Sequence, residues 1–193
     1  AAVTQSTATL TKKNSAATCF DNDGLEDTLY LWFVDRESTE AEYGKVGTWH
    51  TCGATDFYEL FEESVDFDED LIGWDTSAVT KMHGTFYFAH SFNGDVSQWD
   101  TANVESIEYA FYSAFSFNRN LSTWDTSNIR SMRGAFGSAF LFNGDISTWD
   151  TSKVESMGSM FFAAKSFNGE ITGWDVSRVT DMYKMFERAS SFR

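Results

Sequence analysis

Residues 142–168 read FNGDISTWDTSKVESMGSMFFAAKSFN, and close copies of this unit lie on both sides of it. Tryptophans mark the repeat, because six of them follow one another at intervals of 25 residues: Trp49, Trp74, Trp99, Trp124, Trp149 and Trp174. An Asp follows each of the last five, and columns of Val or Ile, Met or Ile, Phe and Ala keep the same period. A fixed period of this kind is typical of architectures in which equivalent units stack.

The spacing inside one unit predicts a short helix and a short strand. Apolar residues fall three or four apart, as on one face of a helix: Val154, Met157, Met160, Phe161 and Ala164. Residues 152–155 have the pattern of a capping box at the start of that helix. Asn168 and Gly169 favour a turn with positive φ, and residues 170–174 have the length of a strand rather than a helix.

A single unit cannot bury both its strand and its helix, whereas a stack of units can. We therefore expect an α/β solenoid in which each 25-residue coil contains a strand, a turn and a short helix. Residues 47–193 would form this solenoid, with a degenerate first coil at residues 47–71 and about five further coils. Residues 1–46 have no repeat register, and we expect them to cap the N-terminal end of the stack.

The unit resembles the BspA-like leucine-rich repeat, a domain of unknown function found in surface lipoproteins. The resemblance covers residues 70–193 and, more loosely, residues 47–70. It implies a leucine-rich-repeat-like solenoid in a secreted or surface-anchored protein, with a role in adhesion or protein contact and no catalytic residue. The family often has Cys in a column that this chain fills with Ala: Ala89, Ala114, Ala139, Ala164 and Ala189. That departure concerns packing rather than chemistry.

The charge of the chain excludes several classes of partner. Its 193 residues include 29 acidic and 14 basic side chains, and the net charge of −15 disfavours nucleic acid and anionic membranes. No apolar run reaches about 18 residues, so we expect no transmembrane segment. The acidic excess is concentrated in one run: Glu59, Glu62, Glu63, Asp66, Asp68, Glu69 and Asp70. This run is either a solvated face or a site for a cation or a basic partner.

Cys19 and Cys52 are the two cysteines of the chain, and they flank the junction between the expected cap and the first coil. We predict a disulfide between them, with two separate thiols as the alternative. A disulfide indicates an oxidising compartment. We therefore expect an extracellular or cell-surface protein or, alternatively, a protein in the lumen of an oxidising organelle.

The sequence indicates neither an enzyme nor a cofactor. It lacks the Gly-x-Ser-x-Gly, Walker and Gly-x-Gly-x-x-Gly motifs, and His50, His83 and His90 do not have metal-ligand spacing. One column of carboxylates could bind calcium between coils: Asp75, Asp100, Asp125, Asp150 and Asp175. We favour the alternative that each carboxylate accepts backbone N–H bonds from its own Asp-Thr-Ser turn. We expect the Trp column in the core rather than on the surface as a platform for sugars.

Positions that vary between units are the candidates for binding a partner, because the fold does not dictate them. On the expected helix side several carry aromatic or large apolar residues: Tyr87, Phe88, Tyr109, Tyr112, Phe115, Phe140, Leu141 and Phe162. Large exposed apolar patches usually mark interaction surfaces, although another segment could instead cover these residues. The C-terminal end of the stack, at Arg193, has no polar cap in this sequence and could contact a partner or further sequence.

These observations lead to three hypotheses about function. We favour a non-enzymatic module for protein–protein interaction or adhesion. The first alternative is a fixed structural subunit of a larger multi-protein assembly, docked by its open end. The second is a binder of glycan or ice surfaces that uses a column of small polar residues: Ser97, Ser122, Ser147 and Thr172.

Overall fold

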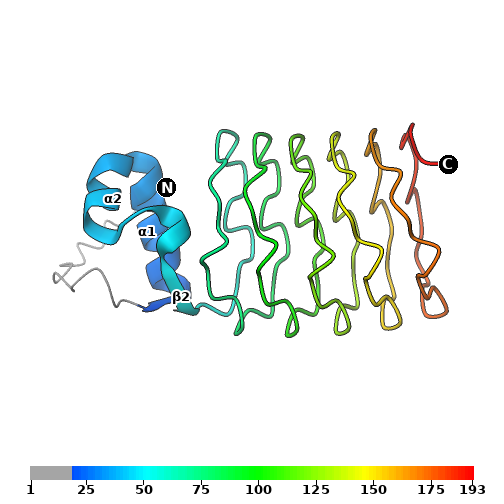
Figure 1. The fold of residues 1–193 in the computed structure, drawn as a ribbon, viewed down its shortest axis with the longest axis horizontal. Helices are drawn as coiled ribbons and strands as arrows, with labels where there is room; N and C mark the ends of the chain where they lie inside the picture. The colour runs from blue at the N-terminus through cyan, green and yellow to red at the C-terminus, as the bar shows by residue number, and fades with distance from the viewer. Residues whose placement is uncertain (1–18) are drawn as a thin grey trace, which may run out of the picture.

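The chain forms a row of coils that lie side by side, with two helices against the N-terminal end of the row (Figure 1). This arrangement comes from a computed structural model, which describes residues 19–193. Among these residues no helix has the length and apolar character needed to cross a membrane.

All the helices and strands lie in the N-terminal part of the described chain. They are the strand β1 (Cys19–Asp21), the helices α1 (Asn22–Val34) and α2 (Arg36–Tyr43), the 3-10 helix η1 (Val46–Thr48) and the strand β2 (His50–Gly53). Strands β1 and β2 pair in parallel. Helix α1 begins where the Asp21 carboxylate accepts the Gly24 N–H at 2.9 Å, a typical N-cap bond. Strand β1 and helices α1 and α2 form the cap, whereas η1 and β2 begin the first coil.

The cap is joined to the first coil by covalent, polar and aromatic contacts. The predicted disulfide between Cys19 and Cys52 is present and links β1 to β2, so this prediction is confirmed. The Asn22 side chain accepts the Thr55 N–H at 2.8 Å. Trp32 of α1 packs edge-on against Phe67, with 5.7 Å between ring centroids. The cap therefore covers the apolar end of the stack.

Backbone hydrogen bonds join each coil to the next. Six residues spaced 25 apart form a continuous series of parallel single-residue bridges: Asp56, Lys81, Ser106, Ser131, Ser156 and Asp181. The predicted strand at residues 170–174 is absent, because strand-like pairing is limited to these single bridges. Each coil instead consists of consecutive tight turns.

The predicted short helix is also absent from the repeats, and turns occupy its place. Each coil has two residues with positive φ, four positions apart, as at Gly84 and Phe88. A left-handed residue interrupts the run of right-handed residues that an α-helix requires. The freed backbone groups bond to the neighbouring coil, as when the N–H of Phe88 donates to the carbonyl of Tyr112 at 2.8 Å. The apolar spacing of three and four remains because these turns also direct side chains inward.

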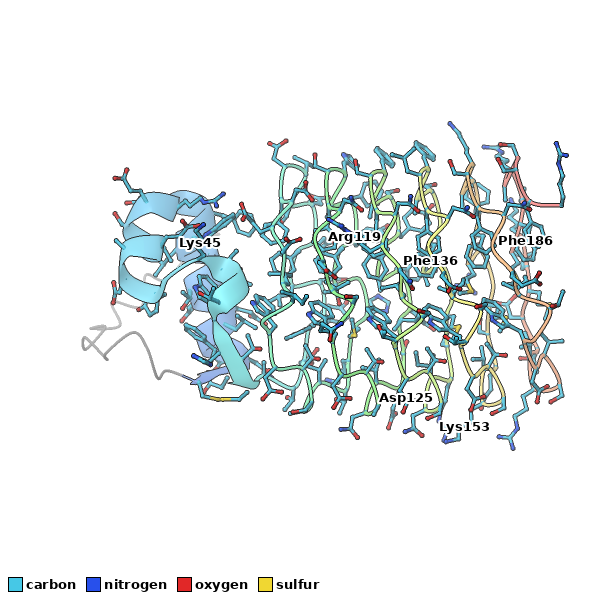
Figure 2. The ribbon with its side chains drawn as sticks, viewed as in Figure 1. Lys45, Arg119, Asp125, Phe136, Lys153 and Phe186 are labelled. Carbon is cyan, nitrogen blue, oxygen red and sulfur yellow. A yellow bond between two sulfur atoms is a disulfide. The ribbon has the colours of Figure 1, made fainter. Side chains whose placement is uncertain are left out.

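Columns of aromatic side chains fill the interior. Neighbouring Trp rings lie nearly parallel at 6.3 Å between centroids from Trp74 to Trp174, and each of these residues is buried. The Phe columns pack beside them, as where Phe136 and Phe142 stack at 3.9 Å. Figure 2 shows Phe136 within the stack, whereas Asp125 and Lys153 lie at its edge. The Trp column thus belongs to the core, as the sequence suggested.

The Asn-Gly pairs have a different role from the expected turn with positive φ. Asn side chains form a ladder between coils, because Asn118 N–H donates to Asn93 Oδ1 at 2.9 Å and Asn143 N–H donates to Asn118 Oδ1 at 2.8 Å. Gly144 does not have positive φ. A Cβ atom there would overlap the carbonyl oxygen of Arg119 in the preceding coil, so Gly is needed for close approach rather than for its conformational freedom.

Candidate functional site

One side of the stack carries the aromatic residues that the sequence singled out. We define the aromatic surface by these residues: Tyr87, Phe88, Tyr109, Tyr112, Phe115, Phe140, Leu141 and Phe162. They lie on the turns of the second to fifth coils rather than on helices, which corrects the expected helix side. Leu141 is 55% exposed and the seven aromatic side chains are partly exposed, in contrast to the inward Phe columns. The structure therefore leaves these rings accessible.

The first part of the aromatic surface is a cluster of four rings. Tyr87 stacks on Tyr112 of the next coil at 5.5 Å between centroids, and Tyr109 meets Tyr112 at 5.8 Å. Phe88 contacts Tyr87 edge-on at 4.5 Å. Burial raises the pKa of Tyr87, and the neighbouring Tyr112 adds to that effect. The Tyr87 hydroxyl therefore remains neutral, and the cluster offers apolar faces with polar rims.

The second part is a short ladder of stacked rings. Phe115 and Phe140 stack at 4.6 Å with an interplanar angle of 6°. The His90 ring stacks on Phe115, with 4.2 Å between ring centroids. The Lys165 ammonium lies 4.1 Å from the Phe140 centroid. Phe88 lies 5.8 Å from His90 and so connects this ladder to the first cluster.

Sequence reasoning missed His90 and Lys165 as members of this surface. Both occupy the column of Phe115 and Phe140, and that shared register was the signal that could have identified them. The Nε2 atom of His90 is buried and has no hydrogen-bond partner among residues 19–193. A histidine in such a position is held by stacking rather than by polar contacts.

Phe162 stacks on neither of these two groups, and Leu141 lies next to the ladder without adding a ring to it. Gly137 occupies the column position between Tyr112 and Phe162, so no ring bridges that coil. Phe162 instead has basic neighbours, with the Arg188 guanidinium carbon 5.7 Å and the Lys184 ammonium 6.0 Å from its centroid. Leu141 is exposed beside Phe140 in sequence. The structure thus brings together six of the eight predicted residues.

The Asp column makes the turn hydrogen bonds that the sequence suggested. Asp125 Oδ1 accepts the Ser127 N–H and Asp150 Oδ1 accepts the Ser152 N–H, both at 2.9 Å. Hydrogen bonding from Ser127 lowers the pKa of Asp125, and hydrogen bonding from Ser152 lowers that of Asp150. Within residues 19–193 no group of three or more His, Cys, Asp or Glu side chains is arranged to hold a metal ion.

A groove separates helix α1 from the first coil. We call this space, of about 480 Å³, the junction groove, and its lining residues are Glu26, Leu29, Tyr30, Phe33, Tyr58, Glu59, Leu60, Glu62 and Ser64. A smaller hollow of about 210 Å³ lies next to it and shares Glu59. Tyr87 and Tyr109 line that hollow, so the groove leads to the edge of the aromatic surface.

The acidic run divides into residues that bond to the neighbouring coil or the cap and residues that line the junction groove. Asp68 and Asp70 accept N–H bonds from Asn93 and Asp95 of the next coil at 2.7 and 2.8 Å. Glu69 pairs with Arg36 of α2 at 2.7 Å. By contrast, Glu59 and Glu62 line the junction groove. The run is therefore neither one solvated face nor one site.

Comparisons with known proteins place the repeat in a family without revealing an activity. A protein-family model described as "Mycoplasma protein of unknown function, DUF285" matches residues 29–139 and again residues 108–193. Together the two matches cover residues 29–193, which include part of the cap and all the coils. No curated protein matches the chain, and no solved structure does.

Proposed function

Because the chain belongs to the DUF285 family of Mycoplasma proteins of unknown function, we propose a role that its surface supports: a non-enzymatic module that binds another protein. The aromatic surface would make the contact. Adhesion is one setting for such a module, and attachment within a larger assembly is another.

The observation that carries this proposal is the ladder of Phe115 and Phe140. In the other coils the same column holds unrelated residues: Val65, His90, Lys165 and Ser190. The fold therefore does not require aromatic rings at these positions, yet two consecutive coils place stacked and partly exposed phenyl groups there. Aromatic side chains of this kind are enriched among the residues that contribute most to binding energy at protein interfaces.

The ladder is also preformed, and it lies between basic side chains on one side and the acidic cap on the other. Its rings are fixed by stacking, so little side-chain entropy remains to be lost on binding. Lys165 lies over the Phe140 ring, and Arg188 and Lys184 lie beside Phe162. The acidic residues of the cap lie at the opposite end of the stack. A partner with complementary charges would be oriented along the stack as it approaches.

The hydrogen-bonded coils support assignment to the leucine-rich-repeat-like solenoids, of the BspA-like kind that the repeat resembles. Their parallel bridges recur every 25 residues. The Cys19–Cys52 disulfide supports an oxidising surrounding and hence an extracellular or cell-surface location. Both assignments fit a module that presents a rigid lateral surface to a partner.

The test is to compare capture of partners by the native protein and by a Phe115→Glu/Phe140→Glu variant. The native protein should capture a partner in stoichiometric amount from its source. Two carboxylates on the ladder should abolish binding of that partner. The matched control is Gln98→Glu/Gly173→Glu, because Gln98 is exposed and a side chain at Gly173 meets nothing within 4 Å. This control adds the same charge elsewhere on the coils and should retain the partner.

Two outcomes would contradict the proposal. If both double variants lose the partner equally, then charge alone explains the loss. If neither loses it, then the partner binds elsewhere. The first surface to test in that case is the apolar group on the last coil formed by Val176, Met182 and Tyr183, each at least 44% exposed. Binding there would favour the alternative of a structural subunit docked by its end.

A further inference from the structure

The junction groove is bordered by a row of backbone carbonyl groups. In the second coil the carbonyls of His83, Thr85 and Tyr87 point back toward the first coil, where they accept N–H bonds from Glu59, Phe61 and Glu63. The first coil repeats these turns, with positive φ at Glu59 and Glu63 as at Gly84 and Phe88. Its equivalent carbonyls belong to Tyr58, Leu60 and Glu62 and so point toward α1. All three of these residues line the groove.

These carbonyl oxygens have no donor within the part of the chain that the structure describes. No backbone or side-chain N–H or O–H of residues 19–193 bonds to the carbonyl of Tyr58, Leu60 or Glu62. Helix α1 covers this end of the stack without supplying the N–H groups that another coil would supply. The groove therefore holds a row of acceptors that a ligand rich in donors could satisfy.

Carboxylates increase the negative potential of this row. Glu26 comes from α1, and Glu59 and Glu62 come from the first coil. Among residues 19–193 no Lys, Arg or His forms an ion pair with any of the three. Burial raises the pKa of Glu62, and the charges of Glu59 and Glu63 raise it further. Without a ligand, the site thus concentrates like charge.

This arrangement is the reverse of what stability alone would favour. Aligned peptide groups have their negative end where the carbonyls emerge, and acidic side chains are unfavourable at such an end. The chain nevertheless places Glu59 and Glu62 there. Basic residues occur instead on the last coil, where the equivalent N–H groups emerge, at Lys184 and Arg188. A bound cation would compensate for the unfavourable placement of these charges.

Aromatic side chains complete the walls of the groove. Tyr30 is 69% exposed and Phe33 is 47% exposed on α1, and Tyr58 is 52% exposed on the first coil. Ring faces beside carboxylates suit organic cations, because a cation is attracted both to the ring and to the charge. A volume of about 480 Å³ is far larger than a metal ion requires. It is instead suited to a guanidinium or ammonium group on a flexible side chain.

We propose that the junction groove binds an arginine or lysine side chain of a basic segment in a partner protein. The donors of that side chain would bond to the carboxylates and the backbone carbonyls, while its alkyl part and charge pack against the aromatic walls. This site is separate from the aromatic surface, and neither site requires the other to function.

The test uses the intact protein and a fluorescent peptide that contains four arginines. A peptide of the same length with citrulline in place of arginine keeps the shape and removes the charge. At about 0.15 M salt, where distant charges are screened, the arginine peptide should bind at least about tenfold more tightly than the citrulline peptide. Fluorescence polarisation gives both affinities.

Paired variants separate a built site from general attraction to an acidic protein. Glu26→Gln/Glu62→Gln should weaken binding by about tenfold, because it removes two carboxylates from the groove. Asp27→Asn/Asp66→Asn removes the same charge from α1 and the first coil outside the groove lining, and it should change the affinity less than about twofold. Tyr30→Ala should weaken binding without a change of charge, whereas Tyr183→Ala, at an equally exposed site on the last coil, should not.

The outcomes are decisive in each direction. Equal losses for the two double variants, or equal affinity for the two peptides, would overturn the proposal. If Tyr30→Ala bound the arginine peptide as tightly as the native protein does, then the aromatic wall would have no role in binding. That result would also overturn the proposal. Circular dichroism of each variant excludes loss of folding as the reason. The Phe115→Glu/Phe140→Glu variant should bind the arginine peptide normally, so the two proposals can fail independently.

Discussion

The indole Nε1–H of Trp124 donates a hydrogen bond to the main-chain carbonyl of Val96, which is 3.1 Å away and 28 residues earlier in the chain. The same bond recurs along the column, from Trp99 to Leu71 at 3.0 Å and from Trp149 to Leu121 at 2.9 Å. Each Trp therefore fills the core of its own coil and also satisfies a buried carbonyl of an earlier coil. This dual role explains why Trp, rather than another large apolar residue, keeps the period.

Replacing Trp124 by Ala should destabilise the protein strongly. The side chain is 3% exposed, and truncating a buried aromatic residue typically costs about 3–5 kcal/mol. Tyr183→Ala is the control, because that ring is 66% exposed and should contribute little. Denaturant unfolding followed by circular dichroism measures both. If Trp124→Ala unfolded at the same denaturant concentration as the native protein, then the Trp column would not carry the core.

Gly144 and Gly173 should respond oppositely to the same substitution. A Cβ atom at Gly144 would overlap the Arg119 carbonyl oxygen, whereas one at Gly173 would meet nothing within 4 Å. Gly144→Ala should therefore cost about 1–3 kcal/mol, as overpacking does, and Gly173→Ala should stay within about 0.5 kcal/mol of the native protein. Thermal unfolding of the pair is the measurement. Similar values for the two variants would mean that the coils can separate locally at no cost.

The sequence was sufficient to predict the inward columns but not the local backbone. Phe136 and Trp149 repeat with the period, and such columns are buried in any stacked arrangement. The helix prediction was wrong because Ser159 and Ala163 have positive φ, although neither residue type favours it. Hydrogen bonds to the next coil stabilise these conformations, and Ala163 N–H donates to the main-chain carbonyl of Glu187 at 2.7 Å. Hydrogen bonds between coils of this kind cannot be predicted from the residues of one unit alone.

Of the two candidate surfaces, one could be predicted from the sequence and the other could not. The contact of Phe115 with Phe140 could be predicted, since residues 25 apart must lie side by side in stacked coils. The junction groove could not, because one of its walls is helix α1, which has no repeat register. The position of Tyr30 relative to the first coil depends on how the cap packs against that coil. That packing requires the structure.

Reducing the Cys19–Cys52 disulfide should lower the stability of the cap. The bond closes a loop across 33 residues, and a loop of this length corresponds to about 3–4 kcal/mol. The Cys19→Ala/Cys52→Ala variant should therefore melt at a lower temperature than the oxidised protein. Thiol titration of the unfolded, unreduced protein should find no free thiol. Two free thiols in that titration would show that the bond does not form in solution.

Acid should destabilise the stack through the Asp column. Hydrogen bonds hold the pKa of Asp125 and Asp150 below the ordinary value of 3.8. A lowered folded-state pKa adds stability that is fully present above the ordinary pKa and is lost as the pH falls through the folded-state value. Melting temperature should therefore begin to drop below about pH 5 and continue to drop as the pH falls below the ordinary pKa. The drop should be smaller for Asp125→Asn/Asp150→Asn, because Asn keeps the turn bond and does not titrate.

Calcium should have no effect on stability. Asp125 and Asp150 each accept a backbone N–H of their own turn at Oδ1. These hydrogen bonds stabilise the negative charge of the carboxylates without a metal ion. Melting with a chelator and with millimolar calcium should give the same temperature and the same oligomeric state. If calcium instead bridged the coils, stabilisation would grow by about 1.4 kcal/mol for each tenfold excess over the dissociation constant. A calcium-dependent shift that Asp125→Asn/Asp150→Asn removed would assign the column to metal binding.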